Sequence, residues 1–168
     1  MEEFVQIRQL DIQDLPLYKH LRLELLENEP ANFGSSFEEE NRFAEQMWIN
    51  RLTKKDIITI GSFYKEELVG MGLAVLNPRQ KLRHVANLNS IYVKKEFRNL
   101  GLAKKMIYFG LKHLMDLDVE IVKLSVVTSN VAAIDLYKKI GFYIYGEDKK
   151  SIKWNNKYID QYLMMKQL

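Results

Sequence analysis

The segment between Lys94 and Lys105 contains residue types that could bind a phosphorylated ligand. Gly101 and Ala103 have little or no side chain, so an anion could approach their backbone closely. Apolar residues at helical spacing predict a helix from Leu102, and the free N–H groups and dipole of a helix start favour a pyrophosphate. The charged side chains around this point are Lys94, Lys95, Arg98, Lys104, Lys105 and the single acid Glu96. An ordinary helix start with solvated lysines has the same composition, and the P-loop and dinucleotide-binding spacings are absent.

Alternating strands and helices must position this segment. Apolar periodicity predicts strands over 4–9, 57–64, 68–76, 85–93, 121–127, 142–146 and 159–166. It predicts helices over 37–52, 102–117 and 131–140. An earlier helix follows the expected N-cap Asp11 and carries the apolar stripe Leu15, Tyr18, Leu21 and Leu25. This order predicts an α/β (α+β) fold in one domain, residues 1–168, with a single mixed, mostly antiparallel central sheet flanked by helices.

The composition excludes several kinds of site. The chain of 168 residues has no cysteine, which removes disulfides, thiolate zinc sites and a cysteine nucleophile. His20, His84 and His113 do not have the spacing of metal ligands, so no metal is expected. The first residues are acidic and lack the basic-then-apolar pattern of a secretion signal. No apolar run reaches membrane-spanning length. We therefore expect a cytoplasmic protein that does not enter a membrane.

Charge is unevenly distributed along the chain. Residues 1–50 contain 11 acidic and 4 basic side chains, whereas residues 51–168 contain 11 acidic and 21 basic ones. This asymmetry suggests a basic part that meets an anion and an acidic part that meets a cation. A solvated surface with uneven charge would give the same counts. A nucleic-acid partner is disfavoured because no basic run is interleaved with aromatic residues.

Two motifs resemble those of the GNAT superfamily of N-acetyltransferases. The sequence Arg98-Asn99-Leu100-Gly101-Leu102-Ala103 is similar to the family signature Arg/Gln-x-x-Gly-x-Gly/Ala, after the fourth strand and at the start of the third helix. The segment from Asn130 to Phe142 is similar to Asn-x-x-Ala-x-x-x-Tyr-x-x-x-Gly-Phe, and Tyr158 to Met164 resembles the closing strand. The order of elements agrees over nearly the whole chain, so the resemblance extends beyond the two motifs.

The resemblance implies that the fourth and fifth strands splay apart and that acetyl-CoA, as co-substrate, enters the gap. It implies that the pantetheine arm lies along Ile91, Tyr92 and Val93. It implies that the pyrophosphate is wrapped by Arg98, Asn99, Leu100, Gly101, Leu102, Ala103 and Lys104. It implies that the next helix holds the pantetheine and the nucleotide through Asn130, Ala133 and Lys139.

The resemblance also assigns the general acid. Tyr137 matches the family residue that gives a proton to the departing coenzyme thiolate. A phenol with an ordinary pKa of about 10 can share or donate a proton in this way. The alternative is an aromatic side chain that only packs on an amphipathic helix, and the spacing to Asn130 and Gly141 favours the catalytic role.

The general base departs from the family pattern. Many relatives have a glutamate on the fourth strand where this chain has Asn89, which cannot accept a proton at neutral pH. The cluster Glu38–Glu40 is a candidate, as a base or as an acidic rim that attracts a cation. Its alternative is a solvated, acidic helix start, with the Ser35-Ser36 pair as the helix cap.

These observations predict an enzyme, an acyltransferase that moves an acetyl group from acetyl-CoA to a primary amine by direct attack in a ternary complex. The amine could belong to a small molecule or a peptide, and a homodimer is compatible with the sequence. Two other functions stay open: a non-catalytic acetyl-CoA-binding regulatory module and a basic nucleic-acid-binding protein.

Overall fold

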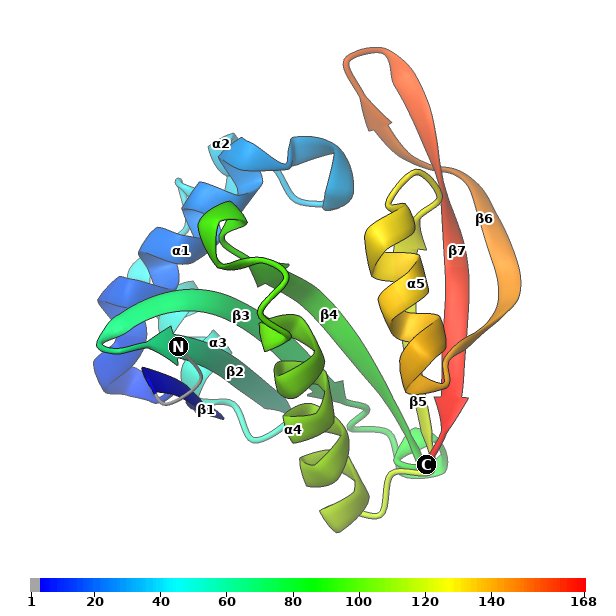
Figure 1. Cartoon of the computed structure of the whole chain (residues 1–168), viewed down its shortest axis with the longest axis horizontal. Helices are drawn as coiled ribbons and strands as arrows, with labels where there is room; N and C mark the ends of the chain where they lie inside the picture. Colours follow the sequence, from blue (N-terminus) through cyan, green and yellow to red (C-terminus); the bar gives the residue numbers. More distant parts are fainter. Residues whose placement is uncertain (1–3) are drawn as a thin grey trace.

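The computed structural model describes residues 4–168 as one seven-stranded sheet with helices on both faces (Figure 1). The strand order is β1-β2-β3-β4-β5-β7-β6, and every neighbouring pair is antiparallel except β4 and β5. The strands are β1 (Val5–Gln9), β2 (Ile57–Tyr64), β3 (Glu67–Leu76), β4 (Val85–Val93), β5 (Ile121–Val127), β6 (Tyr143–Trp154) and β7 (Lys157–Gln167). The predicted mixed, mostly antiparallel sheet is confirmed.

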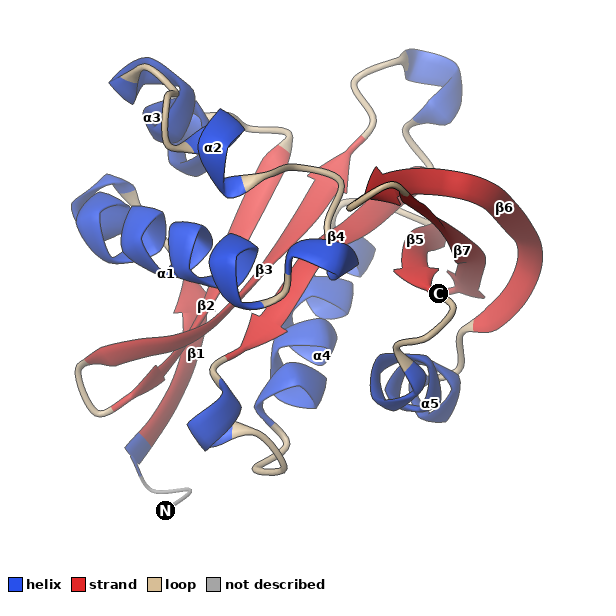
Figure 2. Cartoon of the chain, turned by 90° about the horizontal axis from the view of Figure 1, so that it is seen from above, coloured by secondary structure: helices blue, strands red, loops and turns tan. Residues whose placement is uncertain are grey.

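Helices α1 (Leu15–Asn28), α2 (Phe37–Glu40) and α3 (Glu45–Thr53) lie on one face of β2–β4, and α4 (Leu102–Asp116) lies on the other (Figure 2). Because successive side chains of a strand point to opposite faces, each strand feeds two cores. On β3, Met71 joins the core under α1 and α3, while Ala74 joins the core shared by α4 and α5 (Val131–Ile140). The helices therefore cover both faces of the sheet, and a binding site can form at the ends of the strands.

The parallel pair β4–β5 is short. Its register covers only Val85↔Ile121, Ala86↔Val122 and Asn87↔Lys123, although β4 continues to Val93 and β5 to Val127. Beyond Asn87 the two strands separate, as the splayed-strand prediction requires (Figure 1). The sheet is thus divided at this point by a gap that side chains and helix ends must line.

The start of the chain follows its local signals. Asp11 accepts a hydrogen bond from the Gln13 N–H and forms a reciprocal capping box with Asp14, ahead of α1. The predicted stripe is inward, with Tyr18, Leu21 and Leu25 fully buried. Among residues 4–168, no helix combines the length and the apolar character needed to cross a lipid bilayer.

The prediction of one helix over 37–52 is wrong. The chain forms α2, a turn, and then α3, with Ala44 in an extended conformation before α3 begins. Arg51 donates two hydrogen bonds to the Glu40 carboxylate, at 2.9 and 3.1 Å. In a continuous helix these residues would lie about 16 Å apart along the axis, so the ion pair requires the break. The tertiary contact overrides the helical pattern.

The Glu40 carboxylate is completely buried between two guanidinium groups. Arg22 on α1 donates from Nε and Nη2 at 2.9 and 2.7 Å, opposite the pair of bonds from Arg51. Burial alone would raise the pKa of Glu40, but the hydrogen bonds from Arg22 and Arg51 outweigh it and lower this pKa from 4.5 to about 2. One charge therefore joins α1, α2 and α3.

The strands of the last hairpin are longer than predicted. β6 extends to Trp154 and β7 begins at Lys157, where the sequence periodicity had predicted an end at 146 and a start at 159. Asn155 and Asn156 form the turn with φ values of 48° and 59°, the left-handed geometry of a two-residue hairpin turn. The hairpin projects beyond the sheet and brings its tip toward the loop between α1 and α2 (Figure 1).

We predict that Glu40→Gln lowers the free energy of unfolding by about 3–5 kcal/mol at neutral pH, because two guanidinium groups lose the charge that compensates them. Folded Glu40 stays ionised down to about pH 2, whereas the unfolded chain takes up the proton near its ordinary pKa of 4.5. The contribution is therefore complete above pH 4.5 and is lost as the pH falls toward about 2. Urea denaturation of both proteins should show their difference shrinking over this range, and a constant difference would contradict the assignment.

Candidate active site

A cavity of about 530 Å³ opens where β4 ends, α4 begins and α5 faces them. Every residue predicted from the sequence to contact the coenzyme lines this cavity, except Leu100, and so does Tyr137. Leu100 is partly buried against the core instead. The residues brought together are Ile91, Tyr92, Val93, Arg98, Asn99, Gly101, Leu102, Ala103, Lys104, Asn130, Ala133, Tyr137 and Lys139. Residues far apart in the sequence therefore form a single concave surface.

The start of α4 presents backbone donors to this cavity. Gly101 is the N-cap, has φ of +73° and contributes no side-chain cap, and the first helical backbone bond runs from Lys105 N to Gly101 O. The N–H groups of Leu102, Ala103 and Lys104 thus have no partner within the helix. A Cβ atom built on Gly101 would meet no atom within 4 Å, so glycine is favoured by the left-handed backbone and not by crowding.

Arg98 is positioned by three groups. Its Nε donates to the Val93 carbonyl at 2.9 Å, its guanidinium pairs with Glu29, and it lies 5.7 Å from the centre of the Tyr92 ring. Glu29 follows the last residue of α1, so the pair ties α1 to the end of β4. Glu29 could not be found from the sequence, because nothing local indicates an ion pair across 69 positions of the chain.

A second cavity of about 360 Å³ adjoins the first. Both cavities are lined by Glu29, Asn32, Ile91, Asn130, Ala133 and Tyr137. Asn89 is exposed on β4 and lines this second cavity, so the residue at the expected base position does face the space beyond Tyr137. Glu29 is the single carboxylate among the lining residues, and it is already paired with Arg98.

Tyr137 lies in the wall that separates the two cavities. Burial raises the pKa of Tyr137 to about 12. Its ring meets Phe142 edge-on, with the two ring centres 5.9 Å apart. The side chain is therefore a packed aromatic, as one interpretation predicted, and the same residue lines both cavities.

Asn130 and Lys139 occupy the two ends of α5. The Asn130 side-chain oxygen accepts a hydrogen bond from Ala133 N at 3.3 Å and so caps the helix. This bond uses the carbonyl oxygen of the amide and leaves its NH₂ group uncommitted. Lys139 is exposed at the rim of the first cavity, where its ammonium group can move.

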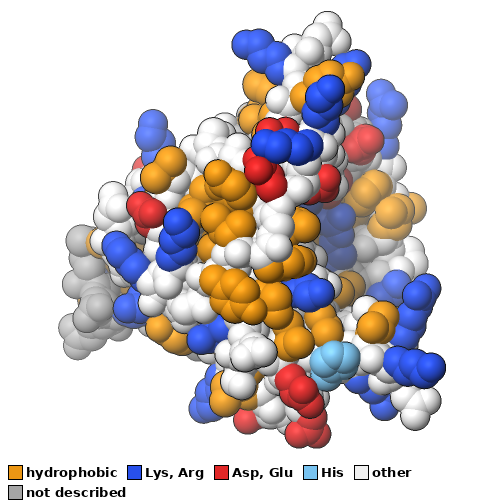
Figure 3. Space-filling view, turned by 90° about the vertical axis from the view of Figure 1, so that its right-hand side faces the viewer, with side chains coloured by type: hydrophobic (Ala, Val, Ile, Leu, Met, Phe, Trp, Pro, Cys, Tyr) orange, Lys and Arg blue, Asp and Glu red, His pale blue; other side chains and the backbone are white. Residues whose placement is uncertain are grey.

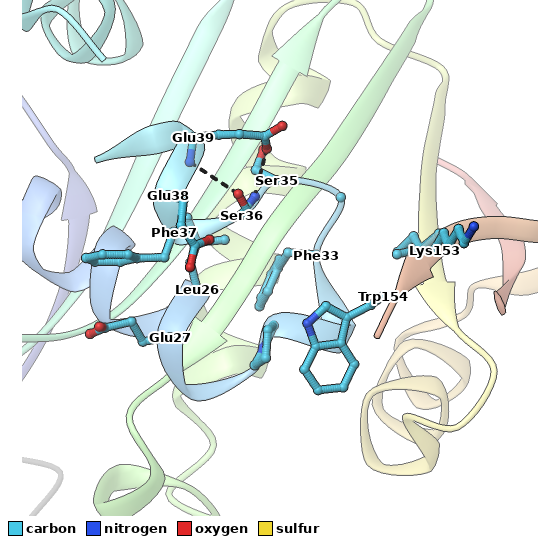
Figure 4. A pocket seen from close by; sticks show the side chains of 13 residues that line it. Leu26, Glu27, Phe33, Ser35, Ser36, Phe37, Glu38, Glu39, Lys153 and Trp154 are labelled. Carbon is cyan, nitrogen blue, oxygen red and sulfur yellow. Dashed lines mark hydrogen bonds between the residues drawn. The ribbon is translucent and has the colours of Figure 1, made fainter. Parts of the chain in front are cut away.

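A third cavity, of about 540 Å³, lies between the loop after α1, the start of α2 and the tip of the β6–β7 hairpin (Figure 4). It shares Phe33, Gly34 and Ser35 with the second cavity. Trp154 at the hairpin tip lies beside Phe33, and Lys153 points away from it (Figure 4). Three carboxylates line this space, from Glu27, Glu38 and Glu39. The three cavities thus adjoin one another in a row.

The acidic cluster predicted from the sequence is divided. Glu38 and Glu39 line the third cavity, but Glu40 is buried between Arg22 and Arg51, so it belongs neither to an acidic rim nor to a solvated helix start. Ser36 caps α2 as expected: its hydroxyl accepts from Glu39 N, and the Glu39 carboxylate accepts from Ser36 N. The sequence analysis missed Glu27 and Trp154, which only the folded chain brings to this place.

Basic side chains do not form one continuous surface on the face that carries the last hairpin. Figure 3 shows them dispersed among acidic side chains around a band of hydrophobic ones. Nothing on this face resembles the positively charged groove that follows a nucleic-acid backbone. Among residues 4–168, no group of three or more histidine or carboxylate side chains is arranged to hold a metal ion.

Comparisons with known proteins identify the family of the chain. Residues 19–142 match the family model described as Acetyltransferase (GNAT) family. An L-amino acid N-acetyltransferase of Escherichia coli is 30% identical over 123 residues, which cover 72% of this chain and 75% of that protein. A spermine/spermidine N(1)-acetyltransferase of Bacillus subtilis is 29% identical over 92 residues, or 52% of this chain and 60% of that protein.

Solved structures show the same fold. The GNAT-family acetyltransferase of Streptococcus pneumoniae superposes with a TM-score of 0.81 at 24% identity, covering 98% of this chain and 99% of that one. A putative acetyltransferase of Salmonella typhimurium, solved with its cofactor acetyl-CoA, also gives a TM-score of 0.81, at 14% identity and with 98% and 94% covered.

We predict that Gly101→Glu weakens acetyl-CoA binding by about 100-fold, which corresponds to about 2.7 kcal/mol, because a carboxylate would stand where an anion needs the bare helix start. Gly101→Ala is the matched control, since it brings the same left-handed backbone strain but a Cβ that meets open space. Calorimetric titration should show a weakened Glu variant and an Ala variant close to the wild type. Equal affinity in all three proteins would remove the helix start from the binding site.

Proposed function

The chain belongs to the acetyltransferase (GNAT) family, and on this premise we propose its reaction. It moves an acetyl group from acetyl-CoA to a cationic primary amine, with both substrates bound in one ternary complex. The observation that carries the proposal is the row of three adjoining cavities, with Tyr137 in the wall shared by the first two. One end of the row is basic and has free helix N–H groups, and the other is acidic and aromatic. Two unlike ligands can therefore meet at Tyr137.

The first cavity fits the coenzyme by its donors. The N–H groups at the start of α4, together with Arg98 and Lys104, would hold the pyrophosphate, and Lys139 would reach a nucleotide phosphate. Ile91, Tyr92 and Val93 would lie along the pantetheine arm, where β4 has parted from β5. Asn130 and Ala133 would border the arm from α5. Acetyl-CoA supplies an activated acetyl thioester at the end of this arm.

Tyr137 would assist departure of the coenzyme thiolate. As the amine nitrogen bonds to the acetyl carbon and the carbon–sulfur bond breaks, negative charge collects on sulfur. Because its pKa is about 12, the Tyr137 hydroxyl is protonated at neutral pH and can donate to that sulfur. The absence of cysteine removes an acyl-cysteine relay, which supports direct attack by the amine.

The acceptor must lose a proton before it attacks. A free primary amine has a pKa near 10.4, so nearly all of it is protonated at pH 7. Asn89 lines the second cavity and cannot accept the proton at neutral pH. We propose that water held by the Asn89 side chain and nearby backbone carbonyls removes the proton. A low local dielectric would assist this step by disfavouring the charged ammonium.

The third cavity would receive the positively charged body of the acceptor. Glu27, Glu38 and Glu39 supply negative charge, and Trp154 and Phe33 supply aromatic faces that attract cations. Two relatives are named for amine acceptors, one for L-amino acids and one for spermine and spermidine. The acidic and aromatic lining favours an acceptor with more than one positive charge.

The catalytic role of Tyr137 predicts the effect of Tyr137→Phe. The variant should lose about 10²–10⁴-fold in kcat, while its acetyl-CoA Kd stays near the wild-type value, because only the proton donor is removed. The ratio of the two kcat values should be constant between about pH 6 and 9, since Tyr137 keeps its proton up to about pH 12. Full activity on a confirmed acceptor would leave Tyr137 with a packing role alone.

The acidic cavity predicts a loss of acceptor affinity. The combined substitution Glu27→Gln, Glu38→Gln and Glu39→Gln should raise the acceptor KM about tenfold, with little change in kcat and in acetyl-CoA Kd. In the wild type the acceptor KM should rise with ionic strength, because salt screens exposed charges. Glu66→Gln, in the exposed β2–β3 turn, is the matched control. A triple variant with wild-type KM and no salt dependence would show that the acceptor is not held by this cavity.

A further inference from the structure

Ser90 interrupts β4 at the point where the coenzyme cavity begins. Its φ is 56°, in the left-handed region, and neither Ser90 nor Ile91 has a Cα partner in β3 or β5. On β3, Met71 pairs with Tyr92 and Leu73 pairs with Asn89, so two steps of β3 face three steps of β4. This is a β-bulge, which turns backbone groups out of the strand ladder.

The opposing strand leaves room for the bulge. A Cβ atom on Gly72 would come within 2.6 Å of Ile91 Cδ1, so glycine allows the Ile91 side chain to lie across β3. Nothing in β3 hydrogen-bonds the Ser90 side chain. The left-handed conformation of a serine costs about 1–2 kcal/mol, and a conformation of this kind persists when surrounding contacts determine it.

The Ser90 side chain is held from α1. Arg22 Nη1 donates to Ser90 Oγ at 2.9 Å, while Nε and Nη2 of the same guanidinium hold the Glu40 carboxylate. Arg22 is only 5% exposed, and Glu40 is fully buried and anchored from its other side by Arg51. The plane of the guanidinium is therefore fixed, and its Nη1 atom points at Ser90 in the bulge.

We propose that Arg22 is a positioning residue for acetyl transfer: through Ser90 it fixes the bulge, and so the direction in which Ile91–Val93 meet the coenzyme. This inference rests on the proposed function, because it takes the cavity lined by Ile91–Val93 to be the coenzyme site. Its chemistry is a charge-assisted hydrogen bond held by a buried ion pair, which is stronger and more directional than a neutral one.

The same network connects the two ends of the site. Glu40 is the last residue of α2, and Glu38 and Glu39 of the same helix line the third cavity. Arg22, which binds Glu40, also donates to Ser90 on β4. The buried Glu40 carboxylate, through Arg22, thus fixes the position of α2 relative to β4. Proximity and orientation of two substrates need such a fixed geometry, since small displacements of a reacting group slow a reaction strongly.

Two substitutions of Ser90 separate positioning from stability. Ser90→Gly and Ser90→Ala both remove the hydroxyl that Arg22 holds and leave the Arg22–Glu40 pair intact. Glycine also relieves the left-handed strain, whereas alanine keeps it, so the Ala variant should melt at a lower temperature than the Gly variant. A property that changes equally in both variants therefore comes from the lost hydrogen bond.

We expect both variants to bind acetyl-CoA about tenfold more weakly in calorimetric titration, and to lose about tenfold in kcat/KM. Amide hydrogens of Ile91–Val93 should exchange faster than in the wild type, measured without any ligand. Affinity within twofold of the wild type together with unchanged exchange would overturn the inference, whatever the melting temperatures. If the wild type itself does not bind acetyl-CoA, the proposed function fails, and the exchange rates alone decide whether Arg22 holds the bulge.

Discussion

The structure depends on a parallel strand pair that ends after three residue pairs. Once β4 and β5 separate beyond Asn87, their facing edges have no partner strand, and buried backbone groups without partners are costly. The fold meets this constraint with elements that keep the gap open and lined: α4 begins at one side of it, α5 closes the other, and the bulge at Ser90 turns β4 away from its ladder. A ligand whose backbone-like groups paired with the free edge of β4 would satisfy the same backbone groups.

Charge is arranged along the row of cavities in the way that the sequence asymmetry suggested. Four acids of the first 50 residues have two kinds of environment: Glu40 is buried in an ion pair that joins α1, α2 and α3, while Glu27, Glu38 and Glu39 line an open cavity. The basic residues that line the coenzyme cavity, Arg98, Lys104 and Lys139, come from the later part of the chain. The two ends of the row are therefore lined by side chains of opposite charge, as the proposed pair of ligands requires.

The parts of the site that the sequence could predict are those encoded locally. Gly101 at a helix start and Asn130 at a helix cap lie within a few residues of the backbone that they shape, so their spacing is sufficient to place them. The helix over 37–52 was mispredicted because the pair between Glu40 and Arg51 is a tertiary contact that the helical pattern does not reveal. Glu29 could not be predicted because its partner Arg98 lies 69 positions away. Trp154 could not be predicted because only the folded chain brings it beside Phe33, although the adjacent Asn155–Asn156 pair carries a hairpin-turn signal.

In the proposed function, both substrates occupy adjoining cavities at the same time, with Tyr137 between them. The most direct measurement is the initial-velocity pattern with acetyl-CoA and a polyamine acceptor varied together. Simultaneous binding predicts reciprocal plots that intersect, because each substrate changes the apparent affinity or turnover measured for the other. Parallel lines would indicate that the acetyl group is first transferred to the enzyme and the coenzyme released, which would contradict direct transfer across Tyr137.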